Sequence, residues 1–283
     1  MAKTPKASDA ARVKAREMRE AQARKDKQVK LVIIGVVTAL VLAIVVSVSV
    51  VVWNQVREDQ AANSVNPTEV FGEHAEGGPI VFSHLGVGKA DPALPTLVEY
   101  FDYSCHVCAD VDVIAGEQLT KGATDGKYNI EFRPVVTVNM PFHQVGTSAS
   151  FIIARESPEN WTKFHHSMMS YFQSEYNAGK GDVTQNPRNS RNKIKEIAIQ
   201  AGVPANVADK IPGATVAENY LKKATDAWGK APVQGRQIGQ DGQPRVGTPE
   251  FVVNGQVRPL PDYRSATPEQ VYTAIVGDLA AKK

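Results

Sequence analysis

Cys105 and Cys108 are the only cysteines in the 283-residue chain, and two residues separate them. The preceding residues 96–101 (Thr-Leu-Val-Glu-Tyr-Phe) predict a short strand, and residues 110–119 predict a helix. Two thiols at this spacing, between a strand and a helix, are suited to disulfide exchange. If Cys105 lies at the N-terminus of the helix, unpaired N–H groups and the helix dipole favour its thiolate, the reactive form. The pattern therefore predicts a dithiol redox site.

Two other uses of the cysteine pair are less favourable. A structural disulfide stabilises little when the loop that it closes is so short. A zinc site needs more ligands, and the chain has six scattered histidines without a second Cys-x-x-Cys motif. His165 and His166 are adjacent, so on a helix they point about 100° apart and should not readily bind one ion. Redox chemistry is the preferred interpretation, and we expect no metal and no organic cofactor.

An uncharged apolar stretch of 23 residues, Leu31–Trp53, lies near the N-terminus. As a helix it spans about 34 Å, enough for the hydrocarbon core of a bilayer. A cleaved signal peptide is the alternative, but its apolar region is usually about 7–15 residues long and ends in small residues. This stretch is longer and ends in Trp53, which suits a membrane interface. The sequence therefore predicts a retained single-pass anchor in the lipid bilayer.

The net charge of +2 hides an uneven distribution. The first 30 residues hold 10 of the 32 Lys and Arg residues but only 4 of the 30 Asp and Glu residues. A basic segment beside a membrane span stays on the cytoplasmic side. The basic tail is therefore explained by membrane topology without nucleic-acid binding, and the body of the protein is expected outside the cytoplasm.

The rest of the chain divides by composition and periodicity. We expect a basic cytoplasmic tail (1–30), a transmembrane helix (31–53), a flexible linker (54–78) and a folded domain (79–283). Within the folded domain, residues 142–229 change to helical spacing between two β-rich halves. Asn254-Gly255 predicts a tight hairpin near the C-terminus. Thr267-Pro268-Glu269-Gln270 then predicts the capped start of a last helix.

The strand, the Cys-x-x-Cys motif, the helical interruption and the segment Val246–Gly255 together resemble a DsbA-type thiol–disulfide oxidoreductase of the thioredoxin superfamily. The resemblance covers roughly residues 79–281. It implies an α/β, thioredoxin-like fold with an inserted helical domain, here preceded by a single N-terminal transmembrane helix. In this family a cis-proline lies beside the active cysteines, and Thr248-Pro249 matches that position. The resemblance implies that Thr248, Pro249 and Val107 contact substrate, with Thr248 pairing an extended peptide by strand addition.

Two further residues are candidates for roles in catalysis. Glu99 lies six residues before Cys105, where the superfamily commonly keeps a buried acid. A buried acid has a raised pKa and can exchange protons with the second cysteine, whereas at a sheet edge Glu99 would simply face solvent. His106, if charged, would favour the Cys105 thiolate and make the site more oxidising. The best-known oxidases have proline then histidine between the cysteines, whereas this chain has His106 then Val107, which leaves the redox direction open.

The sequence thus predicts a membrane-anchored thiol–disulfide oxidoreductase outside the cytoplasm, with disulfide formation as the favoured direction. Its expected partners are reduced exported proteins or peptides, and a quinone-linked membrane reoxidase resembling DsbB or vitamin K epoxide reductase. A disulfide isomerase or reductase is the alternative within the enzymes. A redox-silent peptide-binding module on a thioredoxin fold is the alternative outside them.

Overall fold

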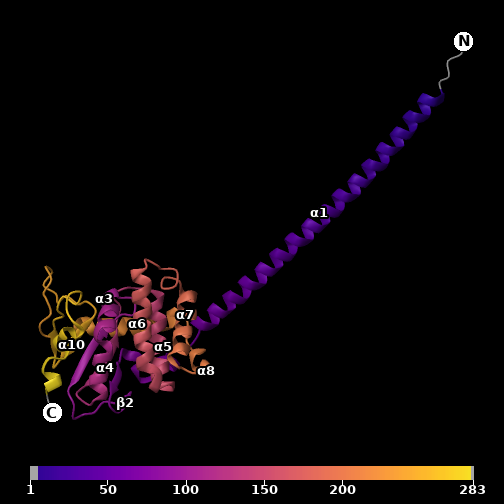
Figure 1. The fold of residues 1–283 in the computed structure, drawn as a ribbon. Coiled ribbons are helices and arrows are strands. Elements are labelled where there is room, and N and C mark those ends of the chain that lie inside the picture. Colours follow the sequence, from indigo (N-terminus) through magenta and orange to yellow (C-terminus); the bar gives the residue numbers. More distant parts are fainter. Residues whose placement is uncertain (1–5, 282–283) are drawn as a thin grey trace. The chain divides into compact units, whose positions relative to one another are not determined.

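The computed structural model describes residues 6–281, which form two compact units. The first unit is Met1–Glu58 and the second is Asp59–Lys283. The first consists, where described, of most of helix α1 (Lys6–Asn63), and the last residues of that helix belong to the second unit. Figure 1 labels the helices and strands of both units where there is room.

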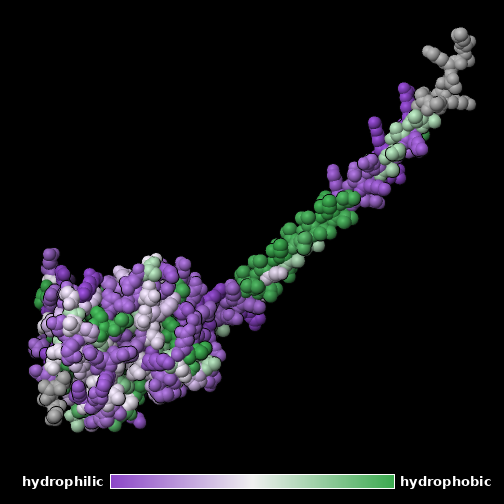
Figure 2. All heavy atoms as spheres, in the orientation of Figure 1, coloured by the Kyte–Doolittle hydropathy of each residue, from purple (hydrophilic) through white to green (hydrophobic). Residues whose placement is uncertain are grey.

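Helix α1 carries the apolar stretch identified in the sequence. From Leu31 to Trp53 its large apolar side chains are exposed, and they form a continuous apolar band between polar flanks in Figure 2. The hydroxyls of Ser47 and Ser49 donate to the carbonyls of Ala43 and Val45, at 2.6 and 2.7 Å. By length and composition the helix can cross a membrane.

A single mixed sheet is the centre of the second unit. Its order is β2-β1-β4-β3-β5-β6 among the residues that the structure describes. The central strand β3 runs parallel to β4 and antiparallel to β5. The strands are β1 (Ile80–Ser83), β2 (Gly86–Val87), β3 (Thr96–Phe101), β4 (Asn129–Pro134), β5 (Glu250–Val253) and β6 (Gln256–Arg258).

One group of helices continues from the end of β3 and another closes the domain. After β3 the chain forms α3 (His106–Val111), the π-helical turn η2 (Asp112–Gly116) and α4 (Glu117–Thr124). At the C-terminus α10 (Pro268–Val276) packs against α4 and η2 and is followed by η5 (Gly277–Ala281). The predicted capping box is present at the start of α10, where Thr267 and Gln270 bond reciprocally at 2.8 and 3.3 Å.

The segment between β4 and β5 is largely helical, as the change of period predicts. Its three longest helices, α5, α6 and α7, pack side by side in Figure 1. Its elements are α5 (Pro141–Glu156), η3 (Pro158–Asn160), α6 (Trp161–Asn177), α7 (Pro187–Ala201), α8 (Ala205–Ala208), η4 (Ala214–Ala217) and α9 (Glu218–Lys230). The expected α/β fold with an inserted helical domain is therefore confirmed.

The segment 54–78 differs from the flexible linker that we expected. Helix α1 continues to Asn63, and α2 (Pro67–Phe71) and η1 (Gly72–Glu76) follow it. Val70 and Phe71 are buried, and the Phe71 ring stacks on Tyr220 with 4.5 Å between ring centroids. The expectation of a flexible linker is corrected, because burial of these residues attaches the segment to the folded domain. Phe71 and Tyr220 are about 150 positions apart in the sequence. Such contacts leave no periodicity in the local sequence.

Candidate functional site

Cys105 lies at the start of α3, where the strand-to-helix transition places it. It is the N-cap residue of the helix, and the Cys108 N–H points to its sulfur at 3.5 Å. The Cys105 N–H donates to the Asp102 carbonyl at 3.0 Å, which closes the turn after β3. Cys105 is 7% exposed and Cys108 is 1% exposed, and both are free thiols. Of the pair, Cys105 is therefore the sulfur closer to solvent.

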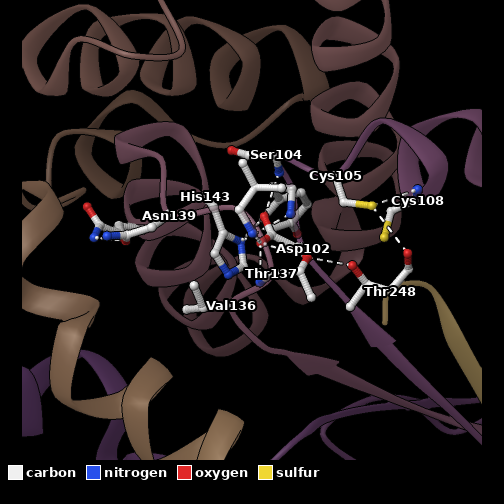
Figure 3. Close-up of polar contacts among 12 residues, drawn as sticks. Asp102, Ser104, Cys105, Cys108, Val136, Thr137, Asn139, His143 and Thr248 are labelled. Carbon is white, nitrogen blue, oxygen red and sulfur yellow. Dashed lines mark hydrogen bonds and ion pairs between the residues drawn. The ribbon is translucent and has the colours of Figure 1, made fainter. Parts of the chain in front are cut away.

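Thr248-Pro249 faces the cysteines from the segment that enters β5. The peptide bond between these residues is cis. The Cys105 thiol donates to the Thr248 carbonyl at 3.3 Å, although 143 residues separate them in the sequence. Figure 3 shows Cys105, Cys108 and Thr248 grouped together. The structure thus brings together the two motifs on which the sequence resemblance rests.

The pKa values of the two thiols are shifted in opposite directions. A hydrogen bond from the Cys108 thiol lowers the pKa of Cys105 to about 6. Bonds from the Thr248 side chain and the Cys108 backbone N–H contribute, while burial opposes the shift. Burial raises the pKa of Cys108 well above its ordinary value, and the hydrogen bond and charge of Cys105 raise it further. Near neutral pH the reduced pair therefore holds a thiolate at Cys105 and a thiol at Cys108.

Glu99 is buried in β3, as the sequence predicts for a strand within the core. It pairs in register with Phe132 of β4 and Phe251 of β5. Burial raises the pKa of Glu99 to about 8, and the negative charge of Asp112 adds to the rise. Among the described residues, the polar contacts of Cys108 do not include Glu99. The expected proton exchange between Glu99 and Cys108 stays a prediction.

The two residues between the cysteines face other parts of the protein. The His106 ring stacks on Tyr176 near the end of α6, with 4.6 Å between centroids and 5° between planes. Val107 is half-buried against the hydrophobic core. The groups that lower the pKa of Cys105 are Cys108 and Thr248. The proposed roles of His106 in acidity and of Val107 in substrate contact stay predictions.

Asp102 is a site residue that the sequence analysis did not identify. Its side chain is fully buried and accepts N–H bonds from Ser104 at 2.7 Å, Thr137 at 2.9 Å and Val138 at 2.8 Å. It therefore ties the loop that carries Cys105 to the loop after β4 (Figure 3). An aspartate three residues before a cysteine resembles an ordinary turn residue, so only its position in the motif hints at this role.

A second connection completes the frame around the cysteines. The hydroxyls of Thr137 and Thr248 bond at 2.7 Å, which links the loop after β4 to the cis-proline segment. His143 is fully buried beside this frame, and its Nδ1 accepts from the Tyr103 N–H at 3.1 Å. Burial lowers the pKa of His143, which favours its neutral form. The three loops that form the site are thus joined by side-chain bonds.

The mixed sheet and the Cys-x-x-Cys motif at a helix N-terminus define a protein with the thioredoxin-like fold. A thioredoxin family model matches residues 84–229, just over half of the chain, so the chain belongs to this family.

Two solved structures are similar to parts of this chain. MdbA of Actinomyces oris, a thiol–disulfide oxidoreductase, is 18% identical, with a TM-score of 0.54 over 77% of this chain and 100% of that chain. Reduced DsbA of Mycobacterium tuberculosis is 20% identical, with a TM-score of 0.48 over 72% of this chain and 94% of that chain. Curated protein sequences include no match to the chain.

Proposed function

We propose that the protein is a membrane-anchored thiol–disulfide oxidoreductase that forms disulfides in exported proteins outside the cytoplasm. The observation that carries the proposal is that the pKa values of the two thiols are shifted in opposite directions. The pKa of Cys105 is lowered to about 6 and that of Cys108 is raised. A stabilised thiolate at the accessible cysteine favours the reduced form of the enzyme. An enzyme whose reduced form is stabilised is a stronger oxidant of other thiols.

The reaction starts from the Cys105–Cys108 disulfide. A substrate thiolate attacks the Cys105 sulfur, the bond between the two enzyme sulfurs breaks, and Cys108 takes the electron pair and a proton. A second substrate thiolate then attacks the substrate sulfur of the mixed disulfide. The substrate disulfide forms and Cys105 leaves as a thiolate, so two electrons pass from substrate to enzyme. A leaving thiol of low pKa speeds this second step.

The substrate peptide is proposed to lie along the cis-proline segment. Thr248 and Pro249 are half-buried at the start of β5, and the Thr248 carbonyl already faces Cys105 at 3.3 Å. Main-chain bonding at Thr248 would hold an extended substrate beside the sulfur, in the manner of strand addition. This mode of binding suits unfolded chains of varied sequence because it uses backbone groups.

The anchor is proposed to be helix α1. Its apolar stretch is long enough to cross a bilayer, and its serine hydroxyls bond within the helix, as a lipid environment requires. The basic residues before Leu31 favour a cytoplasmic N-terminus. A quinone-linked membrane reoxidase, similar to DsbB or vitamin K epoxide reductase, is the proposed acceptor of the two electrons. Anchoring raises the effective concentration of the enzyme near such a partner.

The redox potential tests this proposal. The full chain in detergent is equilibrated in glutathione buffers, and the ratio of thiol to disulfide at Cys105–Cys108 is measured by alkylation and mass spectrometry. We expect a potential well above the value of about −270 mV that is typical of thioredoxin. A potential near or below that value would contradict disulfide formation and favour a reductase.

A further inference from the structure

Three side chains with metal-binding atoms meet at the far end of the helical segment that begins at Cys105. Asp112 comes from η2, and His165 and His166 come from α6. One ligand atom of each lies within 4.8 Å of the others. Asp112 is buried, His165 is fully buried, and the His166 side chain is 19% exposed. The cluster is separate from the cysteines and takes no part in the mechanism proposed above.

One nitrogen of this cluster has no hydrogen-bond partner. His165 Nε2 is buried and unpartnered, and it lies 3.7 Å from Asp112 Oδ1, too far for a hydrogen bond. An unpaired nitrogen beside a buried carboxylate costs free energy unless a cation or a proton lies between them.

The other ring nitrogens are held by a shell of hydroxyl groups. His165 Nδ1 lies 2.9 Å from the Tyr103 hydroxyl, and His166 Nε2 lies 3.3 Å from the Thr120 hydroxyl. Thr120 donates to the Gly116 carbonyl at 3.1 Å, so its oxygen can accept from His166. His166 Nδ1 meanwhile faces the Asp112 carboxylate at 2.8 Å. Metal-binding histidines commonly have their second nitrogen fixed in this way.

We propose that Asp112 and His165 Nε2, together with His166 Nδ1, bind one divalent transition-metal ion, with Zn²⁺ as the preferred ion. Ligands about 2.1 Å from a tetrahedral ion lie about 3.4 Å apart, so the present distances of 2.8 and 3.7 Å to Asp112 Oδ1 need only small adjustments. Two imidazoles suit zinc better than calcium or magnesium, which prefer oxygen ligands.

The proposed site differs from the expectation that the two adjacent histidines do not readily bind one ion. The rings diverge on α6, but His165 offers its distal nitrogen and His166 its proximal one, and Asp112 from another element lies between them. His166 also lines an open hollow of about 660 Å³, together with Thr120, Glu117 and Lys163. A water molecule would complete the four ligands of a zinc ion at the site.

Metal binding at this site would join η2, directly after the helix that carries the cysteines, to α6 of the helical insertion. It would also neutralise Asp112, whose charge contributes to the raised pKa of Glu99. The site would thus stabilise the support of the cysteine helix and make Glu99 more acidic. The proposal does not require the redox function to be correct.

The test uses the full chain in detergent, with Cys105 and Cys108 oxidised so that their sulfurs cannot bind metal. After chelator treatment and buffer exchange, Zn²⁺ is titrated by calorimetry and the bound metal is counted. We expect one Zn²⁺ per chain and a higher melting temperature with Zn²⁺. His166→Gln, which removes a ligand at the edge of the core, is expected to weaken binding roughly a hundredfold or more.

His84→Asn is the matched control. His84 Nε2 also lies near a carboxylate, 3.6 Å from Asp91, but these two side chains are partly exposed in a turn region. This variant is expected to bind Zn²⁺ as the unmodified chain does. Failure of the unmodified oxidised chain to bind stoichiometric Zn²⁺ would overturn the proposal, whatever the variants do. Unchanged affinity in folded His166→Gln would overturn it as well.

Discussion

At the N-terminal end of α3, hydrogen bonds from Cys108 and from the Thr248 side chain lower the pKa of the Cys105 thiol to about 6. At the other end, where α3 passes into η2, the carboxylate of Asp112 lies buried, and nearby Glu99 has its pKa raised to about 8 by burial and by this charge. The first end thus favours a charged group and the second keeps an acid neutral.

The difference lies in the number of donors that each environment offers. A helix N-terminus has free N–H groups that stabilise an anion. Residues inside the core lose water, and Glu99 meets another negative charge there. The surroundings of α3 and η2 therefore favour the charged form of the Cys105 thiol at one end and the neutral form of the Glu99 carboxyl near the other.

The largest effect is expected from removal of one cysteine. Cys108→Ala leaves Cys105 able to form a mixed disulfide but removes the sulfur that would release it within the enzyme. Cys105 is first converted to a mixed disulfide with glutathione, so that the thiolate of a reduced exported protein can attack the Cys105 sulfur and release glutathione as the leaving thiol. We expect covalent complexes with such proteins, seen on non-reducing gels and assigned to Cys105 by mass spectrometry. Cys105→Ala is the matched control and should form none. Complexes through Cys108 alone would reverse the proposed roles.

Loss of the Asp102 side chain is expected to destabilise the loops around Cys105. Asp102→Ala leaves the N–H groups of Ser104, Thr137 and Val138 without their acceptor, which is a fully buried carboxylate. We expect a loss of about 3 kcal/mol in the free energy of unfolding, measured with urea on the oxidised chain. Asp125→Ala, which removes an exposed pair with Lys121, is the control and should leave the midpoint almost unchanged. An equally small effect for Asp102→Ala would contradict its structural role.

Because of Glu99, the free energy of unfolding should decrease as the pH rises. The pKa of Glu99 is about 8 in the folded state and 4.5 in the unfolded state. Between pH 4.5 and pH 8 the folded protein therefore keeps a proton on Glu99 that the unfolded chain has lost. Stability is therefore complete below about pH 4.5 and declines toward pH 8, by at most about 1.4 kcal/mol per pH unit. Glu99→Gln should flatten this decline in urea unfolding of the oxidised chain, whereas exposed Glu218→Gln should not. If the free energy of unfolding of Glu99→Gln declined with pH as steeply as that of the unmodified chain, Glu99 would not be the cause of the decline.

The smallest effect is expected from His106→Ala. A positive imidazole near Cys105 would favour its thiolate, but the His106 ring stacks on Tyr176, and the bonds that lower the pKa come from Cys108 and Thr248. We expect a small rise in the pKa of Cys105, measured by the pH dependence of its alkylation. A rise as large as that caused by Cys108→Ala would make His106 a principal source of the acidity.

Local patterns were sufficient to predict most of the elements. Alternating and helical spacings placed β3 and the helical insertion, and Asn254-Gly255 predicted the hairpin in which both residues have positive φ, at 52° and 75°. The cysteine motif and Thr248-Pro249 were found as separate segments, and family resemblance, not local sequence, predicted that they meet.

The surroundings that could not be predicted from the sequence depend on distant contacts. Asp102 becomes a junction only because the loop after β4 folds against it. Phe71 belongs to the folded domain and not to a linker, because its ring stacks on Tyr220. His165 and His166 converge on Asp112, which lies more than 50 residues before them. None of these pairings has a signature within one element, so only the assembled fold reveals them.

The thiolate at Cys105 is the central claim, and its titration tests it most directly. The reduced full chain is alkylated over a range of pH, and the rates at Cys105 and Cys108 are read separately by mass spectrometry. We predict that Cys105 reacts with a midpoint near pH 6, while Cys108 stays protected at neutral pH. A midpoint for Cys105 near the ordinary thiol value of about 8.5, or faster reaction at Cys108, would contradict the account.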